Sequence, residues 1–236
     1  MRGMNCRALA FAIVLVLGGC AARHDRTLPA AETAGTARFL ALGDSYTIGE
    51  GVASADRWPE ILAGRLATSG VAIGQPEVIA RTGWTTGELS DGIDAAEPRG
   101  PYALVTLMIG VNNQYRGRPV DEYRRDLDAL VTRSIAFAGG RPGRVIVMSI
   151  PDWGATPFAS GRDRAAISAE IDRFNAVAHA AAEHSGTRWA DVTQVSRRAG
   201  HEPALVAGDG LHPSRAMHVA WTDVVLPEAR AALAGP

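Results

Sequence analysis

Short, uninterrupted apolar runs alternate with longer stretches of helical periodicity from residue 37 onward. Five of these runs are predicted to be β-strands: residues 39–42, 78–80, 103–109, 145–150 and 188–192. Their apolar residues are continuous rather than alternating with polar ones, which is typical of strands that are buried on both faces of a sheet. The pattern therefore predicts a parallel sheet of about five strands.

The segments between the predicted strands carry apolar residues at steps of three and four positions, as amphipathic helices do. The predicted buried faces are Trp58, Leu62 and Leu66; Tyr123, Leu127, Leu130 and Ser134; and Ile167, Ile171, Phe174, Ala178 and Ala181. Alternation of strands and helices indicates the α/β class and a three-layer α/β/α sandwich. In such folds, ligands bind beyond the carboxyl ends of the strands, so the residues that follow the strands are the candidates for chemistry.

The first twenty residues have the layout of a secretory signal peptide. Arg2 and Arg7 give a positive start, and residues 8–17 form an apolar run that is too short to span a bilayer. The sequence Leu17-Gly18-Gly19-Cys20 resembles the bacterial lipobox, in which the cysteine becomes the lipidated first residue of the mature protein. We therefore expect residues 1–20 to be a lipoprotein signal peptide that ends at Cys20. The alternative is an ordinary cleaved signal in which Cys20 has no role.

This interpretation predicts an exported protein that is held to a cell-envelope membrane by a lipid anchor, on the periplasmic or extracellular face. Residues 21–36 are rich in Ala and Thr and are expected to form a flexible tether. Residues 37–236 are expected to form one folded domain, with residues 231–236 frayed at its end.

The composition narrows the classes of protein that the chain can belong to. A length of 236 residues suits one α/β domain plus a leader, and 47% hydrophobic residues allow a sizeable core. The 24 basic and 25 acidic residues nearly balance, which gives no reason to expect nucleic acid as a partner. Both cysteines, Cys6 and Cys20, lie at or before the predicted cleavage point. The mature domain therefore has no disulfide, no cysteine nucleophile and no thiolate metal site.

A glycine-rich segment, Gly43-Asp44-Ser45, follows the first predicted strand, and Gly49 and Gly51 come shortly after it. Glycine near a serine lets the chain turn sharply and leaves space beside the hydroxyl group. Taken alone, the segment is also compatible with a plain turn or a phosphate loop. The Gly-Lys-Ser/Thr ending of a Walker-type loop is absent from it.

Two further turns follow the second and third predicted strands. After the second strand, Gly83 can present a bare backbone N–H group, and Thr85 or Thr86 can cap the next helix. After the third strand, the side chain of Asn112 can point its NH₂ group across the sheet edge towards Ser45. An Asx turn, which would have no chemical role, is the alternative for Asn112.

An acid and a histidine lie three residues apart near the C-terminus, in the segment Asp209-Gly210-Leu211-His212-Pro213. Within one turn the carboxylate can hold the imidazole Nδ1–H group and leave Nε2 free as a base. Of the six histidines, only His212 has an acid at this spacing followed by proline. By contrast, His179 and His184 lie off the apolar face of their helix, where we expect solvent, and His218 has no comparable setting.

Taken in this order, the four segments resemble the SGNH hydrolases, also called GDSL-type lipases and esterases, over nearly all of residues 37–232. The resemblance implies a flavodoxin-like α/β/α sandwich and a serine esterase that needs neither metal nor cofactor. It implies that Ser45 is the nucleophile and that Asp209 and His212 complete its triad. It also implies that Ser45, Gly83 and Asn112 donate the hydrogen bonds of the oxyanion hole.

Two positions depart from the pattern of that family. Tyr46 stands where leucine is usual, and we expect it to reshape the pocket wall without touching the nucleophile. Asn113 stands where aspartate is more usual, and we expect it to alter only the packing of its turn.

Four aromatic residues lie after strands or beside the motifs and are candidates for the substrate pocket: Tyr46, Trp84, Tyr115 and Trp153. A role in packing is the equal alternative. Asp152 is a rival for the acid of the triad, but it lacks the local pairing that joins Asp209 to His212.

The residues leave the substrate open among small-molecule, lipid and glycan esters. A carbohydrate O-acetyl ester suits an enzyme facing the cell envelope as well as a lysophospholipid does. A non-catalytic binding module with the same fold is a third possibility, against which the complete set of motif residues counts. A flavin- or phosphate-binding protein would need a loop that cradles an anion, which Asp44 disfavours.

Overall fold

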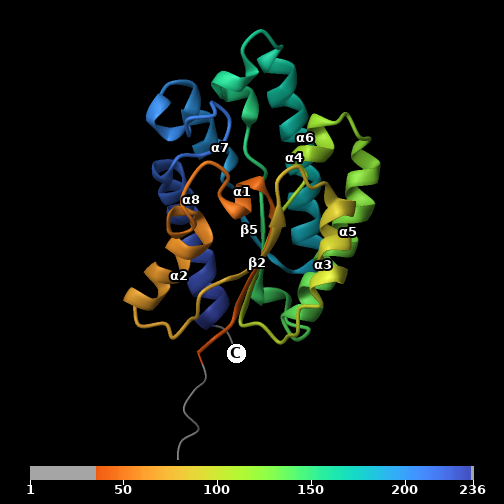
Figure 1. The fold of residues 1–236 in the computed structure, drawn as a ribbon. Helices are drawn as coiled ribbons and strands as arrows, with labels where there is room; N and C mark the ends of the chain where they lie inside the picture. Colours follow the sequence, from red (N-terminus) through yellow and green to blue (C-terminus); the bar gives the residue numbers. More distant parts are fainter. Residues whose placement is uncertain (1–35, 235–236) are drawn as a thin grey trace, which may run out of the picture. The chain divides into compact units, whose positions relative to one another are not determined.

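The computed structural model describes residues 36–234, and these contain a five-stranded parallel sheet (Figure 1). The strands are β1 (Phe39–Asp44), β2 (Glu77–Arg81), β3 (Leu104–Met108), β4 (Val145–Met148) and β5 (Arg188–Ala190). Their order across the sheet is β2-β1-β3-β4-β5, and every neighbouring pair is parallel. The predicted α/β class, strand number and parallel direction are therefore confirmed.

Burial differs between the centre and the edges of the sheet. All residues of β1, β3 and β4 are buried, as their continuous apolar sequences predict. Strands β2 and β5 form the two edges and are only partly buried. Both β4 and β5 end two residues earlier than predicted. One reason is that the N–H group of Ile150 donates to the side chain of Asn175 (2.8 Å) instead of continuing the ladder.

Helices cover both faces of the sheet and form the outer layers of the sandwich (Figure 1). On one side lie α2 (Trp58–Thr68) and α8 (Arg215–Ala234), which pack against each other. On the other side lie α3 (Thr86–Ala96), α5 (Val120–Phe137) and α6 (Arg164–Ser185). The three predicted apolar faces, on α2, α5 and α6, are all buried, because they are the faces that meet the sheet and the neighbouring helices.

Shorter helical segments lie in the connections, several of them beyond the carboxyl ends of the strands (Figure 1). The α-helical ones are α1 (Ser45–Ile48), α4 (Val111–Tyr115) and α7 (Thr193–Ser196). The 3₁₀ turns are η1 (Ser54–Asp56), η2 (Pro142–Arg144), η3 (Trp153–Ala155), η4 (Pro157–Ala159), η5 (Arg197–Gly200) and η6 (Pro203–Leu205).

Helix ends follow local rules that the sequence displays. Helix α3 begins with a capping box: the Thr85 side chain accepts from the Glu88 N–H group, and the Glu88 side chain accepts from the Thr85 N–H group. This settles the cap as Thr85 rather than Thr86. The end of the chain differs from expectation, because α8 continues to Ala234 with Ala232 buried, so residues 231–234 are helical rather than frayed.

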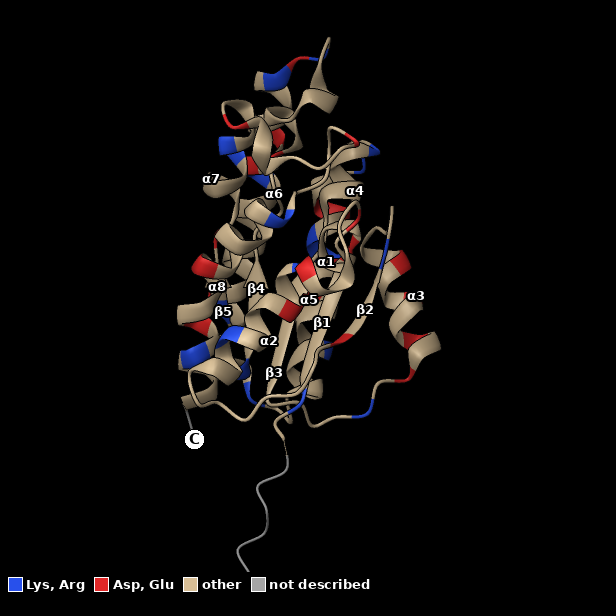
Figure 2. Cartoon of the chain, turned by 60° about the vertical axis from the view of Figure 1, so that its left-hand side comes forward, with Lys and Arg blue, Asp and Glu red and all other residues tan. Residues whose placement is uncertain are grey.

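Acidic and basic residues are interspersed over the helices (Figure 2). Some of them form ion pairs between helices on the same side of the sheet, such as Arg65 with Asp223 and Arg133 with Asp94. These pairs are partly exposed, so each stabilises the fold by only about 0–1 kcal/mol. The buried apolar core between the layers is therefore the main source of stability.

The described residues, 36–234, contain no helix long and apolar enough to cross a membrane. The predicted signal peptide, Cys20 and nearly all of the predicted tether lie outside the described residues.

Candidate active site

Three of the four predicted motifs lie at the same end of the sheet, directly after the carboxyl ends of their strands. Strand β1 lies between β2 and β3, with Asp44 opposite Arg81 and Gly43 opposite Met108. Because the three strands are parallel and end nearly in register, the segments that follow them emerge side by side. These segments carry Ser45, Gly83 and Asn112.

Ser45 is the first residue of α1, a single turn that begins where β1 ends. Asp44 caps this turn, since its Oδ1 accepts from the Tyr46 N–H group at 3.0 Å. Gly43 is required by packing, because a Cβ atom there would lie 2.1 Å from Thr47 Oγ1 and 2.6 Å from the Met108 carbonyl oxygen. The strand, the cap and the small residue together fix the position of Ser45.

Gly83 occupies a tight turn that joins β2 to α3. Its φ of 84° suits the third residue of a type II turn, a conformation that glycine adopts without strain. The Trp84 N–H group closes the turn by donating to the Arg81 carbonyl oxygen at 3.2 Å. Within residues 36–234, no acceptor takes the Gly83 N–H group. This donor is therefore available to a ligand.

Asn112 lies on α4, and its side chain is held between the two neighbouring segments. Its Nδ2 donates to the Trp84 carbonyl oxygen at 2.9 Å and lies 3.4 Å from Asp44 Oδ2. The next residue, Asn113, is fully buried and exchanges hydrogen bonds with Thr86, accepting from its N–H group (3.0 Å) and donating to its Oγ1 (2.8 Å). Asn113 therefore joins two turns, in agreement with its expected role in packing.

The fourth motif forms an acid–imidazole pair. Asp209 Oδ2 lies 2.6 Å from His212 Nδ1, while Oδ1 accepts from the N–H groups of Leu211 and His212, both at 2.9 Å. Partial burial opposes ionisation, but these hydrogen bonds outweigh it and lower the pKa of Asp209. An ionised Asp209 fixes the His212 tautomer with its proton on Nδ1, which leaves Nε2 as an acceptor.

One cleft brings these groups together. Its wall is formed by Ser45, Tyr46, Thr82, Gly83, Val111, Asn112, Tyr115, Trp153, Phe158, Leu211 and His212. Three of the four predicted pocket aromatics, Tyr46, Tyr115 and Trp153, line it. Trp84 does not, because its indole packs against Gly92 of α3. Four other residues also line the cleft but were not predicted to do so: Thr82, Val111, Phe158 and Leu211. Of these, Leu211 could have been inferred from its place next to His212 in the sequence.

Three aromatic rings form one wall of this cleft. The Trp153 ring lies 5.3 Å from Tyr115 and 6.0 Å from Phe158, and its Nε1 donates to Gln114 at 2.8 Å. The Arg162 guanidinium lies 5.2–5.5 Å from the centres of all three rings. Within the described chain, Tyr115 and Phe158 are the large hydrophobic residues with exposed side chains. The cleft thus offers a partly exposed aromatic surface to a ligand.

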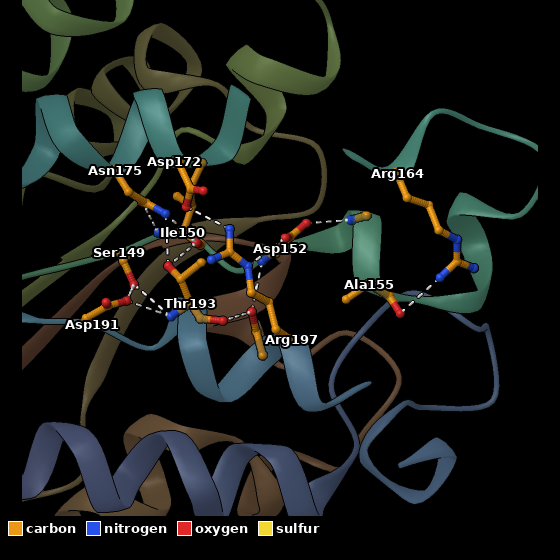
Figure 3. A network of polar contacts seen from close by, with 12 residues as sticks. Ser149, Ile150, Asp152, Ala155, Arg164, Asp172, Asn175, Asp191, Thr193 and Arg197 are labelled. Atoms are coloured by element: carbon orange, nitrogen blue, oxygen red, sulfur yellow. Dashed lines mark hydrogen bonds and ion pairs between the residues drawn. The ribbon is translucent and has the colours of Figure 1, made fainter. Parts of the chain in front are cut away.

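Asp152, the other acid considered for the predicted triad, is bound to an arginine instead of a histidine. It is buried and accepts from Arg197 Nε at 2.9 Å, while the same guanidinium donates to Asp172 at 2.7 Å (Figure 3). Hydrogen bonds among Ser149, Asp191, Asn175 and Thr193 continue this polar network behind the segment that follows β4 (Figure 3). Asp152 therefore anchors the loop that carries Trp153 and is not paired with His212.

The other histidines of the described chain lie apart from this chemistry. His179 and His184 are exposed, as predicted. His218 is completely buried, and its Nδ1 accepts from the Trp58 N–H group at 3.3 Å. Burial, reinforced by nearby His212, lowers the pKa of His218 to about 4, so it is neutral at physiological pH. Residues 36–234 contain no group of three His, Cys, Asp or Glu side chains that could hold a metal ion.

A serine, an acid–imidazole pair, a free backbone N–H group and an asparagine side chain in one cleft of an α/β/α sandwich are the arrangement expected of SGNH hydrolases. Residues 41–220 match the model of the GDSL-like lipase/acylhydrolase family. The chain belongs to this family and is therefore a hydrolase of carboxylic esters, whose substrates are small-molecule esters. No curated protein sequence matches the chain significantly.

Solved structures agree with this fold. TesA has a TM-score of 0.65 and 22% identity, covering 83% of this chain and 99% of its own. The acetylxylan esterase Axe2 from Geobacillus stearothermophilus has a TM-score of 0.65 and 20% identity, covering 82% and 94%. The psychrotrophic esterase EstA from Pseudoalteromonas sp. has a TM-score of 0.64 and 19% identity, covering 84% and 100%. At these identities the likeness concerns the fold.

Asp44 should make the stability of the protein depend on pH. Burial raises the pKa of its carboxyl group from 3.8 to about 7. Between these values the folded protein binds more protons than the unfolded chain, so stability falls as the pH rises. Relative to Asp44→Asn, which keeps the acceptor for Tyr46, the wild type should lose up to about 1.4 kcal/mol per pH unit in this range. Urea unfolding of both proteins from pH 4 to 8 measures this difference, and parallel stability curves would contradict it.

Proposed function

We propose that Ser45 is the nucleophile of this esterase, with His212 as its base and Asp209 as the acid that orients the base. The observation that carries the proposal is the 2.6 Å contact between Asp209 Oδ2 and His212 Nδ1, in a histidine that lines the same cleft as Ser45. With Nδ1 taken by Asp209, Nε2 is the ring nitrogen left to act as the base. A serine hydroxyl is a weak nucleophile by itself, and it needs such a base to attack an ester.

The proposed reaction has two stages. As Ser45 Oγ attacks the ester carbonyl carbon, His212 Nε2 takes the hydroxyl proton, and the carbonyl oxygen becomes an oxyanion. When the tetrahedral intermediate collapses, the bond to the alcohol oxygen breaks, and His212 gives its proton to the leaving alcohol. Water then attacks the acyl-enzyme by the same relay and releases the acid and Ser45. Asp209 stabilises the imidazolium in both stages.

Three donors are proposed to stabilise the oxyanion: the N–H groups of Ser45 and Gly83 and the Asn112 side-chain amide. The Gly83 N–H group supports this role because no protein group of the described chain accepts from it. Asn112 Nδ2 has one short hydrogen bond, to the Trp84 carbonyl oxygen at 2.9 Å, and one long contact, to Asp44 at 3.4 Å. Its second N–H group can therefore turn to an oxyanion at little cost.

The main candidate substrate in this proposal is a carboxylic ester of a small molecule. A carbohydrate O-acetyl ester is the second candidate, and the exposed rings of Tyr115 and Phe158 beside the cleft favour it, because aromatic faces pack well against sugar rings. A long-chain lipid ester is the third candidate. The apolar recess next to the cleft, which shares Tyr46, Trp153 and His212 with it, has a cavity volume of about 20 Å³ and would have to open to take an acyl chain. A module that only binds esters is disfavoured by the complete set of catalytic groups.

We further propose that the enzyme is exported and anchored in the cell envelope through a lipid on Cys20. The lipobox-like sequence at the end of the apolar run supports this proposal. An anchored enzyme of this kind would meet its ester substrates at the periplasmic or extracellular face of a membrane.

Ser45→Ala should abolish hydrolysis of p-nitrophenyl esters without changing the fold, because it removes only one oxygen atom from the cleft. Assays of residues 21–236 on esters from acetate to palmitate measure this loss, with Ser54→Ala, at an exposed serine, as the matched control. Full activity of Ser45→Ala would exclude it as the nucleophile. A decline in kcat/KM from acetate to palmitate would favour the glycan ester, and a rise would favour the lipid ester.

Asp209→Asn should lower kcat by about 10⁴, because an amide no longer fixes the His212 tautomer or balances the imidazolium charge. Its effect on KM should be small, since Asp209 acts on His212 and not on the substrate. Steady-state kinetics on p-nitrophenyl acetate measure both constants. Asp223→Asn, at an exposed acid that pairs with Arg65, is the control. A loss of less than tenfold would argue against the role of Asp209.

Cys20→Ser should release the full-length protein from the membrane fraction and abolish incorporation of a labelled fatty acid when the protein is produced in a bacterium. Cys6→Ser should leave both unchanged, since Cys6 would be removed with the signal peptide. Labelling that persists in Cys20→Ser would rule out this lipidation site.

A further inference from the structure

Arg116 joins the segment that carries Gly83 to the helix that carries Asn112. It directly follows α4, and its N–H group donates to the Asn112 carbonyl oxygen at 3.1 Å. Its side chain extends to the preceding turn, where Nη2 donates to the Gly83 carbonyl oxygen at 2.6 Å. The other terminal nitrogen, Nη1, donates to Glu88 Oε1 at 3.3 Å. Both terminal nitrogens of the guanidinium are thereby held by hydrogen bonds.

The contact with the Gly83 carbonyl oxygen constrains one peptide group on two sides. The peptide group between Gly83 and Trp84 is held at its N–H end by the Arg81 carbonyl oxygen and at its C=O end by Arg116. With this plane fixed, the direction of the Gly83 N–H group depends only on the φ and ψ torsions of Gly83. Since glycine is the most permissive residue at these torsions, the turn relies on outside contacts to hold it.

Other hydrogen bonds join the loop between β2 and α3 to α4, but they bind residues that come after Gly83. Asn112 holds the Trp84 carbonyl oxygen, and Asn113 holds Thr86. Among the described side chains, only that of Arg116 donates to Gly83 itself. The segment around α4 thus supplies one proposed oxyanion donor, Asn112, and also the side chain that holds the turn of the other, Gly83.

We propose that Arg116 is a positioning residue for the oxyanion hole: it fixes the Gly83 turn relative to Asn112, so that both donors point to one oxygen atom. The inference rests on the proposed function of Gly83 and Asn112. Oxyanion donors act over 2.7–3.1 Å, and a small misplacement in an active site lowers the rate strongly. Arg116 does not line the cleft and therefore acts through Gly83 rather than on the substrate.

The test uses Arg116→Gln in residues 21–236, with Arg118→Gln as the matched control. Both arginines are about equally exposed and form ion pairs with a glutamate, Arg116 with Glu88 and Arg118 with Glu122, but Arg118 makes no contact with the Gly83 turn. Arg116→Gln should lower kcat for p-nitrophenyl acetate about tenfold, less than the 10²–10³ expected for losing a whole donor, with KM within twofold. Arg118→Gln should match the wild type in both constants.

Two further measurements separate positioning from stability. The rate at which diethyl p-nitrophenyl phosphate inactivates Ser45 should fall in parallel with kcat, because its tetrahedral adduct needs the same donors. Arg116→Lys should keep more activity than Arg116→Gln, since an ammonium can still donate to the Gly83 carbonyl oxygen. Melting temperatures of all variants should stay close to that of the wild type, because the exposed ion pair contributes little to stability.

An active wild type together with an equally active Arg116→Gln would overturn this inference alone. A loss confined to KM, or one explained by a fall in melting temperature, would also overturn it. A folded wild type without Ser45-dependent hydrolysis would overturn the proposed function and this inference with it.

Discussion

Parallel pairing of β1 with β2 and β3 is the constraint on which the rest of the site depends. Parallel strands send their carboxyl ends to the same edge, and the register places Asp44 opposite Arg81 and Gly43 opposite Met108. Three segments far apart in sequence therefore meet beyond the carboxyl ends of β2, β1 and β3. Burial of β1 and β3 on both faces makes this arrangement rigid, which a site with several fixed donors requires.

The proposed active site combines one pair of residues that are close in sequence with a set of donors that are far apart in sequence. Asp209 and His212 are close in sequence and form their pair within one turn, supported by two backbone hydrogen bonds to Asp209. The proposed oxyanion donors, by contrast, come from different turns that are held together by side chains from the region of α4. The ionised carboxylate of Asp209 favours a positive charge on the imidazole, and the unpaired Gly83 N–H group in the cleft favours a negative charge on a ligand. Together they suit a reaction that forms an imidazolium and an oxyanion at once.

The walls of the cleft are built from the loops after β3 and β4 and from the segment around His212. Asp152, which the sequence offered as a rival acid, instead binds Arg197 and anchors the loop that carries Trp153 (Figure 3). Tyr115 and Phe158 complete an aromatic surface that remains partly exposed. Family membership establishes ester hydrolysis, while in our proposal this surface selects among the possible esters. The proposal thus assigns substrate choice to the loops that carry the aromatic rings, and the reaction to the ends of β1, β2 and β3 together with the segment of Asp209 and His212.

The sequence by itself determined the α/β class, the central strands, the buried helix faces and the positions of the four motifs, because these depend on local periodicity and short spacings. It also indicated the pairing of Asp209 with His212, since residues three positions apart can meet within one turn. Only the tertiary structure decided that Trp84 packs on α3, that Phe158 joins the cleft and that Arg116 reaches Gly83. Trp84 lies 8 positions from Gly92, against which it packs, and Phe158 lies 113 positions from Ser45. Side-chain periodicity carries no information about which distant segments become neighbours.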